Sequence, residues 1–91
     1  MASTEAEAAD WLERQLTQLA AKLDALIHLR TTKRRALLGD RECDFWSGGK
    51  RRQFESDFHP QQTALQALRQ EALSLRGTVH DAREKALKDN N

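Results

Sequence analysis

The chain has 91 residues, of which 38% are hydrophobic and 32% are charged, and its formal net charge is +1. This length allows one domain with a small core. The sequence holds one proline, one valine, one isoleucine and no tyrosine, while helix-forming residues dominate, so the composition excludes a β-sheet protein and predicts an all-α fold.

Cysteine content and apolar runs bear on where such a chain folds. Cys43 is the single cysteine, which excludes an internal disulfide and fits a reducing cytoplasm. The acidic first residues lack the basic and apolar regions of a signal peptide, and no apolar run approaches the roughly 20 residues of a membrane span. We therefore expect no signal peptide, no membrane span and a cytoplasmic folded state; secretion by a route without an N-terminal signal stays open.

The first predicted element is a helix over about residues 9–38. Leucines recur there at spacings of 4, 3, 4 and 3, which places them on one stripe of a helix. These leucines are Leu12, Leu16, Leu19, Leu23 and Leu26. Asp10 is expected to cap the start, the stripe becomes cationic at Arg30 and Lys33, and Gly39 is a typical residue past a helix end.

The centre of the chain, about residues 39–49, is predicted to be a turn. Trp46, Ser47 and Gly48 stand there, followed by a second glycine. Residues 30–52 carry eight basic and three acidic side chains, so positive charge gathers around this turn. Ion pairs with neighbouring acids are the simplest role for these bases, with docking of an acidic partner or of phosphate as alternatives. The near-neutral net charge and the scarcity of aromatic residues argue against nucleic acid.

The second predicted element is a helix over about residues 50–88. Its stripe keeps spacings of 4 and 3 without a slip, with Gln61 as the polar member. The stripe consists of Phe54, Phe58, Gln61, Leu65, Leu68, Ala72, Leu75, Val79, Ala82 and Ala86. Pro60 lacks an amide hydrogen, so either one helix ends near residue 59 and another begins, or one helix continues with a kink. The preserved register favours the kinked helix.

Two long helices lying side by side cannot enclose both of these stripes. The sequence therefore predicts a helical hairpin that pairs into an antiparallel four-helix bundle dimer. The expected partner-binding residues are Leu12, Leu16, Leu19, Leu23, Leu26, Phe54, Phe58, Leu65, Leu68, Leu75 and Val79. The partner is either a second copy or a different chain. The polar stripe members Arg30, Lys33 and Gln61 favour a different chain, because self-pairing would bury each of them twice.

With these features the chain resembles the WxG (ESAT-like) family, the small helical hairpins of bacterial type VII secretion. The resemblance covers about residues 10–88 and rests on the central Trp46-Ser47-Gly48, the helix–turn–helix frame, and Phe54 and Phe58 followed by leucines at heptad spacing. It implies that the turn is also a recognition motif, through which the secretion ATPase is reached indirectly.

The chain departs from the family at the expected export signal. Many members carry Tyr-x-x-x-Asp/Glu after the second helix, whereas His80 and Glu84 here keep the spacing without the phenol. The export signal is then expected on a partner, either a second small hairpin or the N-terminal helical domain of a secreted toxin. The expected function is to dimerise and to be exported with, or to escort and target, that partner effector.

The sequence offers no pattern for catalysis or for a cofactor. Cys43, His28, His59 and His80 are too scattered for a recognised metal site, so no metal, cofactor or catalytic residue is expected. The alternative function is a coiled-coil adaptor or chaperone of another bacterial secretion system. A small helical enzyme of the chorismate mutase type would need a third helix and cationic residues converging in a pocket.

Overall fold

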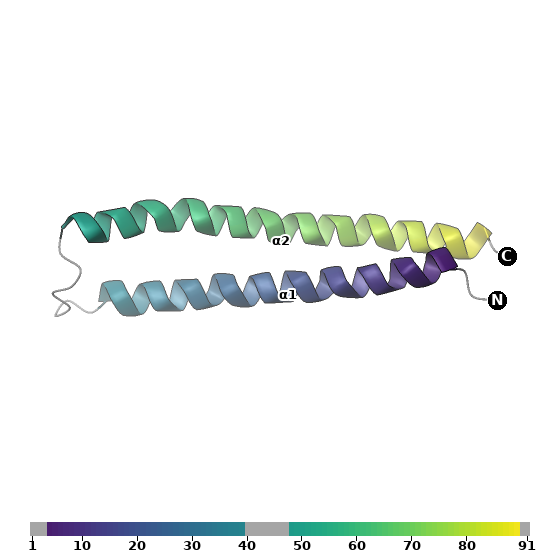
Figure 1. Ribbon diagram of the computed structural model, residues 1–91, viewed down its shortest axis with the longest axis horizontal. Helices are drawn as coiled ribbons and strands as arrows, with labels where there is room; N and C mark the ends of the chain where they lie inside the picture. Colours follow the sequence, from purple (N-terminus) through teal and green to yellow (C-terminus); the bar gives the residue numbers. More distant parts are fainter. Residues whose placement is uncertain (1–3, 40–47, 90–91) are drawn as a thin grey trace.

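A computed structural model describes residues 4–39 and 48–89 of the chain. This part consists of two α-helices and no strand: α1 (Thr4–Gly39) and α2 (Gly49–Asp89). The helices run antiparallel, with the start of α1 beside the end of α2 (Figure 1). The all-helical, two-helix architecture expected from the sequence is therefore confirmed.

The start of α1 lies earlier than the leucine spacing suggests. The helix begins at Thr4 rather than near residue 9, and Glu5 and Glu7 lie in its first turn. Alanine and glutamate are good helix formers, and acidic side chains near a helix N-terminus interact favourably with its dipole. Asp10 is consequently not a capping residue, because it lies inside the helix.

The second helix runs through Pro60 without interruption, as one continuous ribbon in Figure 1. A proline inside a helix leaves the carbonyl four residues earlier, here that of Ser56, without its usual donor. Both residues are exposed, so water can reach that carbonyl. The position of Pro60 on the outer surface explains why the helix tolerates it.

Gly48 precedes α2 and has a φ of 61°, in the left-handed region that side chains with a Cβ rarely adopt. Its carbonyl oxygen accepts a hydrogen bond of 3.2 Å from the amide of Arg52, which closes the first turn of the helix. The remaining predicted turn residues, Trp46 and Ser47, lie outside the described residues, as does Cys43.

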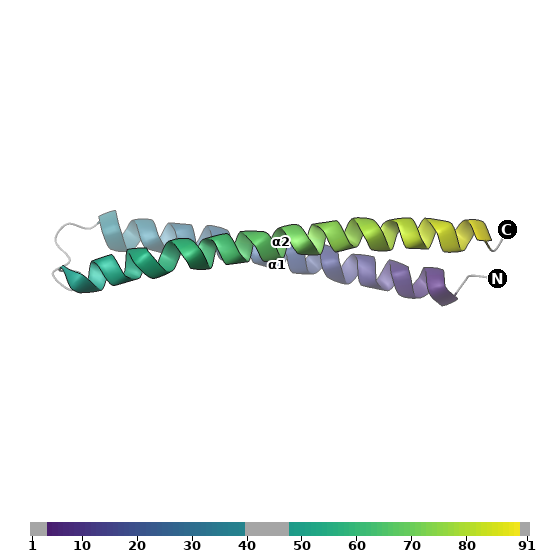
Figure 2. The same cartoon turned by 90° about the horizontal axis from the view of Figure 1, so that it is seen from above.

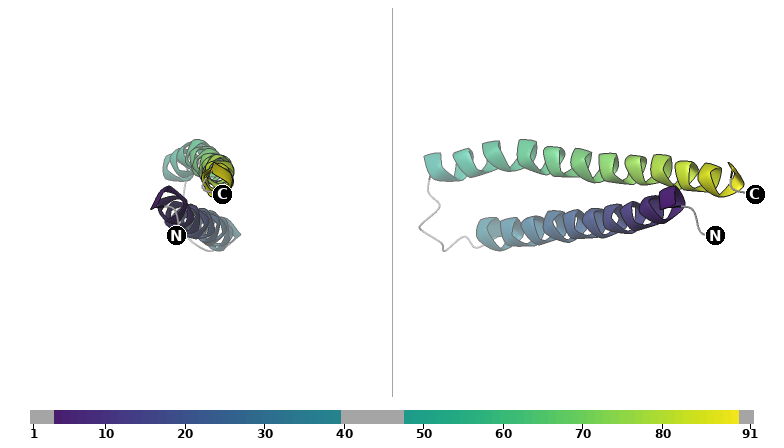
Figure 3. Two further views of the ribbon diagram at one scale, coloured as in Figure 1. Left: turned by 90° about the vertical axis from the view of Figure 1, so that its right-hand side faces the viewer. Right: turned by 45° about the vertical axis from the view of Figure 1, so that its right-hand side comes forward.

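The hairpin is long and thin, with extents of 67 × 17 × 13 Å and a Cα radius of gyration of 20.3 Å. A compact domain of this length has a radius of about 12 Å. The helices cross at the middle of the hairpin when seen from above (Figure 2) and lie close together when seen end-on (Figure 3). Such a shape buries little, and no described side chain is completely buried.

The core of the hairpin is a single row of small and medium apolar residues along the seam between α1 and α2. Its centre is formed by Leu16, Ala20, Ala72 and Val79, with Ala9 and Leu73 packed against it. Ala6, Leu23 and Phe58 extend the buried row towards both ends of the hairpin. The seam is therefore one side chain deep, and its two flanks decide what the molecule presents to its surroundings.

Candidate functional site

One flank of the seam, here called the polar side, is closed by hydrogen bonds and ion pairs between the helices. Arg69 Nε lies 2.8 Å from Asp24 Oδ1, and Arg76 Nη1 donates to Thr17 Oγ1 at 3.4 Å. Both α2 residues are partly buried against α1. These contacts recur every seven residues on each helix, which is two turns, so they form a ladder along the seam.

The ladder is densest near the start of α1. Arg83 Nη1 donates to Asp10 Oδ1 at 3.0 Å and lies 3.3 Å from Glu13 Oε2. His80 Nδ1 lies 3.0 Å from the other carboxylate oxygen of Glu13. Burial disfavours the charge of Arg83, yet hydrogen bonds to Glu84 and Asp10 and the attraction of Glu13 raise its pKa overall. The polar side is thus occupied by contacts within the hairpin itself.

A second cluster stands at the turn end of the seam. Arg30 donates from Nε to Gln62 Oε1 and from Nη2 to Gln61 Oε1, each at 2.7 Å. Gln62 is the buried polar residue of the described chain, and its amide nitrogen donates in turn to the Ile27 carbonyl at 3.2 Å. The cation of Arg30 is therefore held by neutral amides, and it lies 5.2 Å from the ring centre of Phe58.

Arg34 belongs to the same cluster, because its guanidinium also lies near the Phe58 ring, at 5.3 Å from the ring centre. It forms a two-pronged pair with Glu55, from Nε to Oε1 at 2.8 Å and from Nη2 to Oε2 at 2.7 Å. These hydrogen bonds lower the pKa of the Glu55 carboxyl and raise that of the Arg34 guanidinium. Part of the basic charge at the turn end is thus neutralised locally.

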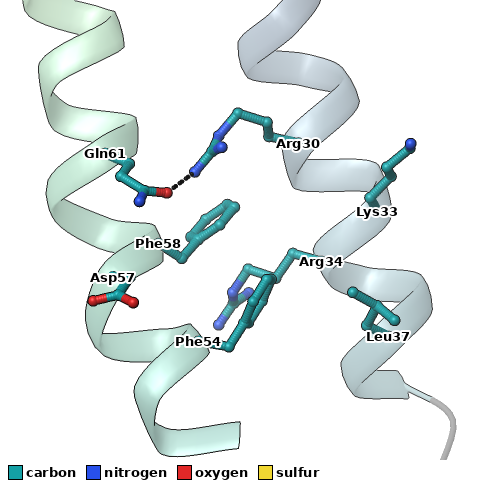
Figure 4. Close-up of a pocket in the computed structure, with 8 residues that line it drawn as sticks. All are labelled: Arg30, Lys33, Arg34, Leu37, Phe54, Asp57, Phe58 and Gln61. Atoms are coloured by element: carbon teal, nitrogen blue, oxygen red, sulfur yellow. Dashed lines mark hydrogen bonds between the residues drawn. The ribbon is translucent and has the colours of Figure 1, made fainter. Parts of the chain in front are cut away.

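The turn-end cluster borders an open groove of about 320 Å³ between the helices, which we call the tip groove (Figure 4). Figure 4 shows Phe54 and Phe58 standing between the helices, with Arg30 and Arg34 reaching from α1 toward them. The full lining is Arg30, Lys33, Arg34, Leu37, Phe54, Asp57, Phe58 and Gln61. The groove brings Lys33 of α1 onto the same flank as Phe54 and Gln61 of α2, and this flank is the one opposite the polar side.

The flank opposite the polar side carries exposed leucines along the rest of its length. We call it the leucine face; it comprises Leu12, Leu19 and Leu26 of α1 with Leu68 and Leu75 of α2. Leu68 and Leu75 remain 46% and 49% exposed, whereas Leu16 in the seam is 8% exposed. Four of the five precede a seam or ladder residue by one position, such as Leu68 before Arg69, and Leu26 precedes the half-buried Ile27. In an antiparallel pair of helices these positions lie on one and the same flank.

The predicted partner-binding residues divide between these two environments. Leu16, Leu23, Phe58 and Val79 are buried in the seam, and Leu65 is half-buried there. Leu12, Leu19, Leu26, Leu68 and Leu75 lie on the leucine face, and half-buried Phe54 lies in the tip groove. The structure thus shows that part of each stripe is used inside the hairpin and part is left exposed.

Sequence reasoning missed the polar side. Arg69, Arg76 and Arg83 are spaced by seven, and so are Asp10, Thr17 and Asp24 on α1. Read in opposite directions, the two series pair Arg69 with Asp24, Arg76 with Thr17 and Arg83 with Asp10, as the structure shows. The signal was present as matched polar repeats, but apolar spacing alone does not detect it.

No known protein family, characterised protein or solved structure matches this chain. Neither described helix carries an apolar stretch long enough to cross a bilayer. Among the residues that the structure describes, no three metal-ligating side chains gather at one point. What the arrangement offers chemically is a row of exposed leucines ending in a cationic, aromatic groove, which is suited to binding another helical surface.

Proposed function

We propose that this chain is a non-catalytic interaction protein whose leucine face is covered by a second helical pair, giving a four-helix bundle. We further propose that it acts as a WxG-like hairpin of type VII secretion, exported with a partner effector or escorting and targeting it. The leucine face is the observation that carries the proposal.

The physical argument rests on the unequal flanks of the seam. Burying apolar surface contributes about 25 cal/mol per Å², and each of the five leucines of the face still exposes more than a third of its side chain. A row of this kind is uncommon on monomeric proteins and marks an interaction site. A second pair of helices can cover this row of leucines, since side chains at heptad spacing fit into the gaps between side chains of a facing helix.

The secretion role is supported by fewer features. Two helices of 36 and 41 residues joined near the middle of the chain fit the hairpin frame of the family that the sequence resembles. Gly48 lies directly before α2 and has a left-handed backbone conformation, which gives the glycine of the Trp-x-Gly motif a backbone role. The partner in this proposal is a second copy of the chain, a second small hairpin or the helical N-terminal domain of a toxin. The chain has no tyrosine, so the tyrosine-based export signal stands on an associated chain of another sequence.

Co-expression with such partners from neighbouring genes tests the proposal. Leu19→Glu combined with Leu75→Glu places two charges on the leucine face, so we expect the partner to be lost from pull-downs and from the culture medium. Gln18→Glu with Ser74→Glu is the matched control, because both positions are exposed and lie one residue away on the outer surface. Retention of the partner by the leucine-face variant, with its helicity intact, would contradict the proposal.

The second candidate is a coiled-coil adaptor or chaperone of another secretion system, which the same exposed face would serve. Trp46→Ala separates the two functions. If the chain is a WxG-like secretion protein, the Trp46→Ala variant keeps its partner bound and export of that partner falls at least tenfold, because the recognition turn is lost. If the chain is instead an adaptor or chaperone of another secretion system, Trp46→Ala changes neither partner binding nor export.

A further inference from the structure

The exposed residues on the leucine-face flank of α1 form a self-complementary pattern: reversed, the sequence of charged and apolar positions matches itself with opposite charges facing each other. Spaced by seven, they are Glu5, Leu12, Leu19, Leu26 and Lys33, an acid and a base separated by three leucines. At about 1.5 Å per residue, the two charges lie about 42 Å apart on the helix. Glu5 and Lys33 are both exposed, and neither forms an ion pair with another residue in the described part of the chain.

A second copy laid antiparallel on this flank would match the pattern at every position. With Leu19 at the two-fold axis, it meets its own counterpart, Leu12 meets Leu26, and Glu5 meets Lys33. A two-fold interface uses the same surface on both subunits, so it requires this kind of self-complementarity. Arg76 contacts Thr17 and Arg69 contacts Asp24, so Leu75 and Leu68 stand on either side of the same axis.

The charges also distinguish between two possible orientations. With the turns of both copies at the same end, Arg30, Lys33 and Arg34 of each copy would gather together. The acidic Glu5 and Asp89 of both copies would gather at the opposite end. Reversing one copy instead places the acidic open end of one hairpin against the cationic turn end of the other. Opposite charges attract and like charges at such distances repel, so the reversed orientation is favoured.

The structure also removes the main objection to self-pairing. The sequence suggested that Arg30, Lys33 and Gln61 would each be buried twice in a dimer of identical chains. Arg30 and Gln61 instead hydrogen-bond to each other within one hairpin at 2.7 Å. Lys33 lies at the end of the face and, in the antiparallel arrangement, meets the carboxylate of Glu5 from the second copy. None of the three then enters the interface unpaired.

We propose that the occupant of the leucine face is a second copy of this chain, antiparallel about an axis at Leu19, with Glu5 of each copy paired to Lys33 of the other. This rests on the proposed function only in that the same face is used. It adds the identity of the partner, the orientation of the pair and the two residues that set its register.

The first test is the mass and affinity of the pure chain by sedimentation. We expect twice the 10.4 kDa of one chain. Glu5→Lys and Lys33→Glu should each weaken the dimer roughly tenfold or more, because the two-fold axis doubles every pair and each variant places like charges together. The combined Glu5→Lys, Lys33→Glu chain restores opposite charges and should dimerise within about threefold of the original. Single variants as tight as the original, or a double variant as weak as the singles, would overturn the pairing.

The second test is oxidation of introduced cysteines in a Cys43→Ser background, which leaves a single thiol. Leu19→Cys should form a covalent dimer, because residue 19 meets its own counterpart at the axis. Gln18→Cys is the matched control and should stay uncrosslinked, since it lies on the outer surface. If the turns instead lie at the same end, Leu19→Cys fails alone and forms a bond only with Leu75→Cys, which overturns the proposed orientation.

These outcomes separate this inference from the proposed function. A pure chain that stays monomeric, yet binds a co-expressed partner through Leu19 and Leu75, overturns self-pairing and leaves the proposed function standing. A dimer that forms as described, while a partner binds regardless of the leucine-face substitutions, supports self-pairing and overturns the proposed use of the face for cargo.

Discussion

The two flanks of the seam differ in how far the hairpin covers them with its own side chains. On the polar side, arginines from α2 reach across to acids and hydroxyls of α1, so the hairpin closes that flank with its own side chains. On the leucine face, the same turns of the same helices end in exposed apolar groups. The difference shows that a hairpin only one side chain deep covers one flank with its own side chains and leaves the other exposed.

The largest expected effect comes from comparing leucines three residues apart. Leu23→Ala removes a buried seam residue and should lower the free energy of unfolding by about 2–3 kcal/mol. Leu26→Ala removes an exposed group and should cost less than about 0.5 kcal/mol in a dilute, monomeric sample. Urea titrations followed by circular dichroism measure both values. In a concentrated sample the cost of Leu26→Ala should rise, and equal losses at both concentrations would contradict the assignment of the two flanks.

A smaller effect is expected on the polar side. Arg83→Met keeps much of the side-chain volume but removes the contacts to Asp10, Glu13 and Glu84. We expect a lower Tm, by less than Leu23→Ala causes. The difference should shrink in about 1 M salt, where charges are screened beyond about 3 Å. Lys85→Met is the control, because Lys85 is exposed and lies outside the ladder. A Tm that is unchanged or raised would show that the ladder does not hold the helices together.

The smallest effect is a pH dependence at the turn end. The hydrogen bonds from Arg34 hold the folded-state pKa of Glu55 below its ordinary value of 4.5. The stability that this pair contributes is therefore fully present above the unfolded-state pKa and is lost as the pH falls through the lowered one. The Tm difference between the original chain and Glu55→Gln should be constant at neutral pH and should decline below about pH 5. A difference that grows on acidification has the wrong sign for this pair.

The fold class followed from the sequence because helix formation here depends on local features. Good helix formers and an unbroken 4, 3 spacing of leucines predict two helices, and Gly48 with Gly49 predict a change of direction between them. The predicted start of α1, near residue 9, was wrong. Residues 4–9 contain alanine and glutamate but no regularly spaced large apolar residues, so the leucine spacing does not extend the helix over them. Asp10 was consequently assigned to a cap instead of to the ladder.

The candidate site was harder to predict, because both stripes are wider than the seam that uses them. A stripe with two apolar columns, such as Leu16 with Leu19, fits a neighbour on either side equally well. The polar residues beside the stripe, such as Arg69 and Asp24, decide on which side of the stripe the second helix packs. Long-range pairing of that kind depends on the register between the helices, which the spacing within either helix does not determine.

Gln62 gives the hairpin something that its repeating contacts lack. A ladder that repeats every seven residues would look much the same if one helix slid along the other by two turns, about 10 Å. Arginine would still find an acid or a hydroxyl, and apolar groups would still meet. Gln62 is the next rung of this ladder, seven residues before Arg69, and its amide donates to Thr31. It differs from the other rungs because its side-chain oxygen also accepts from Arg30, whose seven-residue neighbours on α1 are leucines that cannot donate. Gln62 thereby fixes the register of the two helices, which the repeating contacts alone would leave open to a shift of two turns.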